Sequence, residues 1–259
     1  MTDNAALPSR DGRIYWWDIL IVVLLGGVLG LVISLAAMAA ATGIAMAMGV
    51  HLGDPAALVQ SLKFDFTANQ VALVTSDAGF LIVTWWIARR RSGAALAAFF
   101  PPVGWRNLVL AVLSGLALSL AINGGNELLS YAKLVDFHDT DIERAIQPHN
   151  WWQYAVAFGT MALFAPFFEE FFFRGLLLRW LGRIGGTAVA ILVTALLFAG
   201  VHGQFALHPG AQGLLFSFEL FLAGVVLALW VRATGSLRAS FATHAAYNAT
   251  ALLFSVLFP

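Results

Sequence analysis

The sequence lacks cysteine and has few charged residues. With no cysteine among its 259 residues, disulfide bonds and thiol catalysis are excluded. Charged residues make up 11% of the chain, against about 25% in soluble domains, and 60% of its residues are hydrophobic. A soluble protein could not cover its surface with so few charges, so the sequence predicts an integral membrane protein. The net charge of +0 gives no reason to expect a nucleic-acid partner.

Long apolar runs divide the chain into about seven stretches that could each cross a bilayer, which takes about 20 residues of helix. They cover residues 17–48, 70–88, 108–131, 151–181, 186–202, 213–231 and 240–258. We therefore expect an all-α, polytopic membrane bundle of about seven transmembrane helices around an intramembrane catalytic cavity. The predicted division is an N-terminal region, residues 1–150, with about three of these helices, and a catalytic core, residues 151–259, with about four.

Basic residues gather in alternate loops of this predicted bundle. They precede the first span and lie between the second and third, fourth and fifth, and sixth and seventh spans: Arg10, Arg13, Arg89, Arg90, Arg91, Arg106, Arg179, Arg183, Arg232 and Arg238. The positive-inside rule then places the N-terminus in the cytoplasm. We expect an integral protein of the bacterial inner (plasma) membrane.

Three polar patches interrupt the apolar runs, although a charge at the bilayer centre costs about 3 kcal/mol or more. The first patch is Glu169-Glu170 with Arg174. Adjacent helix positions point about 100° apart, so the two glutamates cannot share one face. Glu170 precedes Arg174 by four positions, the favourable order for an ion pair, so we expect Arg174 to hold Glu170 and leave Glu169 free. In the alternative, Arg174 snorkels to the interface and the glutamates neutralise it.

The second and third patches have the same four-residue spacing. Phe198 and His202 share one helix face, as do His244 and Asn248. Taken alone, His202 could be an interface residue, and the third patch could be interhelical hydrogen bonding worth about 0.6 kcal/mol. At about 1.5 Å per residue, however, all three patches reach similar depths near mid-membrane. The sequence therefore predicts one cavity lined by Glu169, His202, His244 and Asn248.

The chemistry of such a cavity suits hydrolysis by water. No serine in the patches lies in a Gly-x-Ser-x-Gly motif, and the chain has no cysteine, so water is the expected nucleophile. Asparagine and histidine N–H groups suit a developing oxyanion. Two histidines and a glutamate also form a known catalytic zinc set, here Glu169, His202 and His244, although they come from different helices and no His-Glu-x-x-His motif occurs. We favour a site that requires no cofactor, with zinc as the alternative.

The order Glu-Glu-x-x-x-Arg, Phe-x-x-x-His, His-x-x-x-Asn resembles the CPBP (Abi) family of CAAX prenyl endopeptidases and bacteriocin-processing intramembrane proteases, over about residues 151–258. The resemblance implies an endopeptidase that cleaves CAAX-type, bacteriocin or other membrane-associated peptides, and whose family often carries the label metalloprotease. It implies that Glu169 is the general base that activates water and that His202 holds this water. His244 and Asn248 would stabilise the oxyanion. The supporting residues would be Glu170, Arg174 and Phe198.

Two other functions fit the same polar residues. One is a non-catalytic scaffold or immunity protein of the same family, and the other is a proton-coupled transporter that uses the glutamates and histidines as a relay. For the leading hypothesis, the expected partners are a peptide or membrane-protein substrate and the lipid bilayer.

The remaining marked residues receive no catalytic role. Polar residues within the spans are expected to form hydrogen bonds in the bundle or to line a cavity: Asp77, Asn123, Asn126, Glu127 and Glu219. Histidines in the predicted outer loops are expected to be solvated: His51, His138, His149 and His208. The run 171–173, three phenylalanines, is expected to pack against lipid and neighbouring helices.

Overall fold

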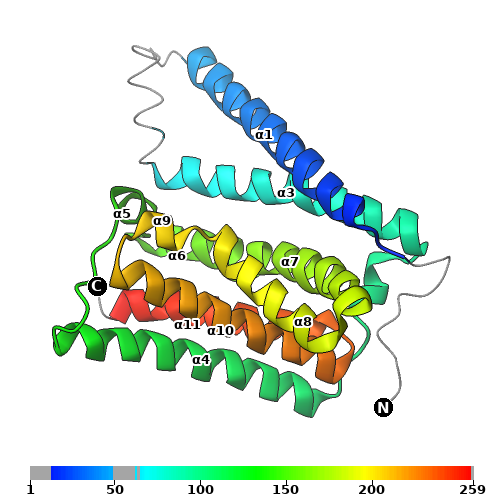
Figure 1. Ribbon diagram of the computed structural model, residues 1–259. Helices are drawn as coiled ribbons and strands as arrows, with labels where there is room; N and C mark the ends of the chain where they lie inside the picture. Colours follow the sequence, from blue (N-terminus) through cyan, green and yellow to red (C-terminus); the bar gives the residue numbers. More distant parts are fainter. Residues whose placement is uncertain (1–12, 49–61, 63–64, 258–259) are drawn as a thin grey trace.

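The computed structural model describes residues 13–48, 62 and 65–257, and every regular element in these residues is helical (Figure 1). This confirms the all-α prediction. Five stretches are long and apolar enough to cross a membrane: Trp16–Ile44, Phe66–Ser92, Trp105–Tyr131, Trp151–Leu207 and Ala211–Thr234. The chain is therefore a helical integral membrane protein.

The predicted number of seven spans is approximate. The stretch Trp151–Leu207 is 57 residues long and contains the fourth and fifth predicted spans, which are separated by a kink at Gly186. Gly186 has a φ of 77°, a conformation that side chains other than glycine rarely adopt. The seventh predicted span corresponds to α11 (Leu237–Leu257), which has 21 residues and carries Arg238, His244 and Asn248, and which is not among the five candidate spans in the described part of the chain.

The first two long helices pack against each other through glycines. They are α1 (Trp16–Ala47) and α3 (Phe66–Ser92). A Cβ atom added at Gly79 of α3 would collide with backbone atoms of Gly30 and Gly26 in α1, so this close approach requires glycine. At one end of the pair, Arg91 forms a 2.8 Å ion pair with Asp18, which is buried.

The third long helix, α4 (Trp105–Tyr131), lies along α11. The Thr243 hydroxyl of α11 donates to the Ala111 carbonyl at 2.9 Å. The indole of Trp230, in α10 (Ala211–Thr234), donates to Ser114 of α4 at 2.8 Å. Although α4 falls in the predicted N-terminal region, it therefore packs directly on helices of the predicted core.

The central helix changes its winding twice around the two glutamates. It consists of α6 (Trp151–Ala157), η2 (Phe158–Phe164), α7 (Ala165–Glu169), η3 (Glu170–Leu177) and α8 (Leu178–Val201). Both η2 and η3 are π-helical, a winding that is frequent at functional sites. Pro166 has no N–H and cannot donate to the Ala162 carbonyl, which removes one α-helical hydrogen bond next to η2.

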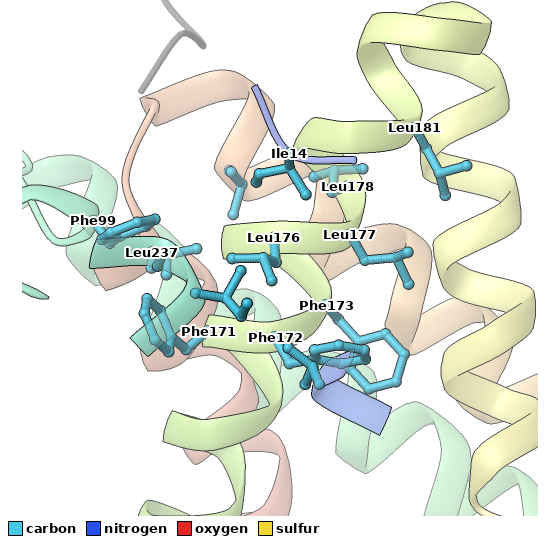
Figure 2. Packing of buried hydrophobic residues seen from close by; sticks show 14 of the residues in the cluster. Ile14, Phe99, Phe171, Phe172, Phe173, Leu176, Leu177, Leu178, Leu181 and Leu237 are labelled. Carbon is cyan, nitrogen blue, oxygen red and sulfur yellow. The ribbon is translucent and has the colours of Figure 1, made fainter. Parts of the chain in front are cut away.

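The hydrophobic core lies around η3 and the start of α8, towards the end of the bundle where α1 begins (Figure 1), and Figure 2 shows how its side chains pack. The three phenylalanines at 171–173 are buried in it together with Leu176 and Leu177. Phe99, in the short 3₁₀ turn η1 (Leu96–Phe99), packs edge-on against Phe171 with ring centroids 4.9 Å apart. The phenylalanine run thus packs against neighbouring helices, as predicted.

Two short helices lie at the opposite end of the bundle (Figure 1). One is α5 (Asp141–Ile146), in the connection between α4 and α6, and the other is α9 (Gln204–Leu207), which leads into α10. A capping box starts α5: Thr140 accepts from the backbone of Glu143, and Glu143 accepts from the backbone of Thr140.

Candidate active site

One cavity of about 490 Å³ contains all four residues predicted to line it. Glu169 reaches it from the end of α7, His202 from the end of α8, and His244 and Asn248 from α11. Apolar side chains provide much of the remaining wall, among them Leu73, Leu118, Leu220, Leu227 and Leu252. The estimates of depth along the predicted helices thus placed these side chains correctly.

The ion pair predicted from the four-residue spacing is present. Arg174 Nη1 lies 3.0 Å from Glu170 Oε1, and both side chains are completely buried. Arg174 also donates to the Gly224 carbonyl at 3.1 Å, and its guanidinium lies over the Phe198 ring at 4.6 Å. The alternative in which Arg174 snorkels to the membrane interface is wrong, because none of its side chain is exposed.

His244 connects the two neighbouring glutamates. Its Nδ1 donates to Glu170 Oε1 at 3.0 Å, and its Nε2 lies 3.6 Å from Glu169 Oε2. The Ser240 hydroxyl donates to the second oxygen of Glu170. Glu170 therefore fixes the orientation of His244 so that Nε2 points towards Glu169.

Glu169 differs from its neighbour in environment. Its side chain is 20% exposed and lines the cavity, whereas that of Glu170 is completely buried. The Oε2 atom of Glu169 is buried and makes no hydrogen bond within the described part of the protein. Leaving a buried acceptor unsatisfied costs about 1–3 kcal/mol, so this oxygen is suited to bind a water molecule or substrate group in the cavity.

Phe198 sets the positions of both histidine rings. The Phe198 ring lies 4.6 Å from that of His202 and 5.7 Å from that of His244, measured between centroids. The Phe198 carbonyl accepts a hydrogen bond of 2.7 Å from His202 Nδ1. A neutral His202 then carries its lone pair on Nε2, where it can accept a hydrogen bond.

Asn248 both joins two helices and lines the cavity. Its Nδ2 donates to the Met161 carbonyl in η2 at 2.7 Å. This bond is the interhelical hydrogen bond that was the alternative role for the third patch. Asn248 nevertheless also lines the cavity. The amide nitrogen has two hydrogens, so one N–H remains for a ligand after the first has fixed its direction.

The candidate zinc ligands Glu169, His202 and His244 all line the cavity. Within residues 13–48, 62 and 65–257, no group of three His, Asp or Glu side chains is arranged to hold a metal ion. Nδ1 of His244 is bound to Glu170 and Nδ1 of His202 to the Phe198 carbonyl, which leaves Nε2 of each ring as the atom that would bind a ligand or an ion. The cavity thus presents a carboxylate, two imidazoles and an amide around a space large enough for a peptide group.

The connection between α4 and α6 also belongs to the site, which the sequence did not predict. Asp139, Glu143, Gln147 and Pro148 of this connection line the same cavity. Thr140-x-x-Glu143 is a capping-box pattern and could have revealed α5, although not its position over the cavity. Ser240 was also missed, although it lies one helical turn before His244 and therefore on the same face.

The prediction that His208 is solvated is wrong. Its side chain is 1% exposed, and its Nε2 lies 2.9 Å from Glu143 Oε1. Burial alone would raise the pKa of Glu143, but hydrogen bonds from Thr140 and His208 hold this pKa below its ordinary value. His138 and His149 are exposed as predicted, and His51 lies outside the described residues.

A second cavity, of about 350 Å³, adjoins the first. Both are lined by Asp139, Gln147, Pro148, Ala251 and Ser255. Four polar residues from the second half of α4 line this second cavity: Asn123, Asn126, Glu127 and Ser130. This matches the prediction that polar residues within the third span line a cavity.

Comparison with known proteins gives a result for the C-terminal part of the chain. The comparison with curated proteins found no match, and neither did the comparison with solved structures. Residues 150–250 match the family model described as type II CAAX prenyl endopeptidase Rce1-like. The matched residues include the three polar patches and the elements from α6 to α11 that build the cavity. The predicted resemblance to the CPBP (Abi) family is therefore confirmed over residues 150–250, the part of the chain that matches the Rce1-like family of CAAX prenyl endopeptidases.

Proposed function

We propose that this protein is an intramembrane endopeptidase in which Glu169 activates water to hydrolyse a peptide bond in or near the bilayer. One observation carries the proposal: Glu169, His202, His244 and Asn248 line a single cavity, and the Glu169 carboxylate has a buried oxygen that accepts no hydrogen bond from the described residues. The matched family of prenyl endopeptidases supports a peptidase activity. CAAX-type, bacteriocin or other membrane-associated peptides are the proposed substrates.

In the proposed first step, water attacks the carbonyl carbon of the scissile bond. Glu169 removes one proton from the water, and Nε2 of His202 accepts a hydrogen bond from its other hydrogen. The carbonyl oxygen gains negative charge as the tetrahedral intermediate forms. The second N–H of Asn248 and a protonated Nε2 of His244 stabilise this oxyanion.

In the second step, the bond between carbon and nitrogen breaks. Glu169 gives the proton it took from water to the departing nitrogen, so the products are a new carboxyl end and a new amino end. Glu170 accepts from His244 Nδ1 at 3.0 Å and stabilises the imidazolium form that the oxyanion requires. None of these steps needs a metal ion, and zinc stays the alternative to be tested.

We further propose the location and organisation expected from the sequence. The protein would lie in the bacterial inner membrane with its N-terminus in the cytoplasm, because the arginines of the described residues gather at the end of the bundle where α1 begins. Residues 151–259 would supply the catalytic groups. Residues 1–150 would provide helices that enclose them, with α4 as the closest neighbour of α11.

A library of membrane-associated peptides tests the activity. We expect the purified protein in liposomes to cleave at least one peptide, and Glu169→Ala and His202→Ala each to abolish or strongly reduce cleavage. Cleavage that neither substitution changes would contradict the proposed site. A proton-driven uptake without cleavage would indicate the carrier function, and partner binding without cleavage would indicate the scaffold.

Chelation tests the metal question separately. We expect a chelator to leave the cleavage rate unchanged and metal analysis of the purified protein to find no stoichiometric zinc. Loss of activity that returns when zinc is added would contradict the metal-free mechanism and indicate zinc binding by Glu169, His202 and His244.

A further inference from the structure

The two ends of the bundle differ strongly in charge. One end, which we call the basic end, carries nine of the described arginines: Arg13, Arg89, Arg90, Arg91, Arg106, Arg179, Arg183, Arg232 and Arg238. The acidic end is the opposite one, where the described residues include Asp65, Glu127, Asp136, Asp139, Asp141 and Glu143 and two basic residues, Lys133 and Arg144. In Figure 1 the turn after α10 lies at the basic end, and α5 and α9 lie at the acidic end.

The basic end is closed by packed side chains. The buried cluster whose packing Figure 2 shows includes Phe99, Leu178, Leu181 and Leu237, which belong to segments at this end and are each less than 9% exposed. The Glu170–Arg174 ion pair, next in sequence to the cavity residue Glu169, is also completely buried. No residue from 89–106, 179–186 or 232–240 is among the described residues that line either cavity.

The cavity instead reaches the surface at the acidic end. Its wall includes three exposed residues there, Asp139, Gln147 and Ser255. The second cavity continues from these residues along the end of α4, where Glu127 and Ser130 are exposed. A path from Glu169 to the exterior therefore leads past α5 and the end of α11.

We propose that the active-site cavity receives its substrate at the acidic end, from the non-cytoplasmic side of the membrane, and that this substrate is a polypeptide segment with neutral or basic residues next to the cleaved bond. The inference rests on the proposed peptidase function. The positive-inside rule places the basic end in the cytoplasm, so the opening of the cavity faces away from it.

The charge of the cavity mouth defines the substrate class. Among the described residues, no lysine or arginine lines either cavity, whereas Glu127 and Asp139 present exposed carboxylates. The amide nitrogens of Asn123 and Gln147 already donate to Ser119 and Asp139. Their amide oxygens line the second cavity as hydrogen-bond acceptors for the N–H groups of a peptide backbone. A free C-terminal carboxylate would meet like charge at this mouth, where no lysine or arginine of the described residues lines the cavity. Among the proposed substrates, a segment with a basic flank is therefore favoured over a CAAX-type C-terminus.

Single cysteines test the direction of the opening, because the natural chain contains none. Ser255→Cys places a thiol at the mouth of the cavity. Gly104→Cys is the matched control at the basic end, since Gly104 is exposed and an added Cβ meets nothing within 4 Å. Each full-length variant is produced in the bacterial inner membrane and treated with a membrane-impermeant maleimide, before and after the membrane is opened.

We expect the impermeant maleimide to label the Ser255 variant in sealed spheroplasts and the Gly104 variant only after lysis. Labelling in the reverse order, or of both variants in sealed spheroplasts, would overturn the proposed side of entry. This result does not depend on catalysis, so it stays interpretable even if no cleavage is found.

Flanking charge in the substrate tests the second half of the proposal. For the wild type in liposomes, kcat/KM should be about fivefold higher for a peptide with lysine next to the cleaved bond than for its glutamate counterpart, the ratio expected for about 1 kcal/mol of Coulomb energy. Glu127→Gln should reduce this ratio, whereas Asp136→Asn should not, because Asp136 lies at the same end but lines neither cavity. Equal rates for both peptides, or faster cleavage of the acidic one, would contradict the proposed substrate class.

Discussion

At the scale of single residues, the two neighbouring glutamates have different roles because they point in different directions. Glu170 is completely buried between Arg174, His244 and Ser240, whereas Glu169 lines the cavity. A carboxylate enclosed by two nitrogen donors and a hydroxyl cannot readily act as a base. Glu169, with a buried oxygen that makes no hydrogen bond among the described residues, can accept a proton from water.

Replacing Arg174 should destabilise the protein strongly. Arg174→Met leaves the Glu170 carboxylate buried without its cation, which typically costs about 3–5 kcal/mol. We expect a large decrease in the thermal unfolding midpoint in detergent. The double variant Glu170→Gln/Arg174→Met removes both charges and should recover much of this loss. If the single variant were as stable as the wild type, the ion pair would not support the site as described.

Removing the amide of Asn248 should act on the transition state rather than on substrate binding. Asn248→Ala deletes an N–H that we assign to the oxyanion, and the loss of one such donor typically lowers kcat by about 10²–10³. The KM should change little. Steady-state kinetics on a cleaved peptide measure both quantities, with a control of the folded fraction because the Met161 bond is lost as well. A raised KM at unchanged kcat would show that Asn248 only binds substrate.

At the scale of helices, the contact between α4 and α11 depends on a single glycine. A Cβ atom at Gly115 would collide with the Thr243 carbonyl oxygen, which belongs to the backbone and cannot rotate away. We expect Gly115→Ala to force the helices apart and to cost about 1–3 kcal/mol, the usual range for overpacking. Since Thr243 and His244 are adjacent, the variant should also lose cleavage activity.

Gly124 in the same helix provides the matched control. An added Cβ there meets nothing within 4 Å, so Gly124→Ala should be neutral or stabilise the helix by about 0.5–1 kcal/mol. Unfolding midpoints of the two alanine variants compare them directly. Equal midpoints would show that the close approach at Gly115 does not limit how α4 packs.

The connection that contains α5 should respond to acid through Glu143. Hydrogen bonds from Thr140 and His208 hold the pKa of Glu143 below its ordinary value despite burial, so the ionised form favours the folded state. Its contribution is present above the unfolded pKa of about 4.3 and is lost as the pH falls through the lower folded value. The stability difference between the wild type and Glu143→Gln should therefore shrink in acid. A difference independent of pH would contradict this assignment.

At the scale of the whole molecule, much of the site could be predicted from the sequence because membrane burial makes polar residues informative. Three patches with four-residue spacing predicted the pair of Glu170 with Arg174 and the cavity that contains Glu169. The all-α class followed from the apolar runs. The number of spans was approximate, because the fourth and fifth predicted spans form one long stretch and α11, which carries His244 and Asn248, is not among the five candidate spans of the described residues.

The rest depended on contacts between distant segments, which helical spacing does not encode. The buried His208 makes a hydrogen bond with Glu143, which lies 65 positions earlier in the chain. The bond from His244 to Glu170 joins residues 74 positions apart and required the packing of η3 against α11. The closed basic end likewise depends on η1, whose Phe99 packs against Phe171 of η3, 72 positions later in the chain.

The central claim is that Glu169 is the base of an intramembrane peptidase, and its most direct test is the cleavage rate of an isosteric variant. Glu169→Gln keeps the shape of the side chain and removes its basicity, so kcat should fall by about 10²–10⁴ while the fold is retained. Glu219→Gln, at another buried intramembrane glutamate that does not line the catalytic cavity, should cleave at nearly the rate of the wild type. If Glu169→Gln cleaves as fast as the wild type, Glu169 is not the base and the account is wrong.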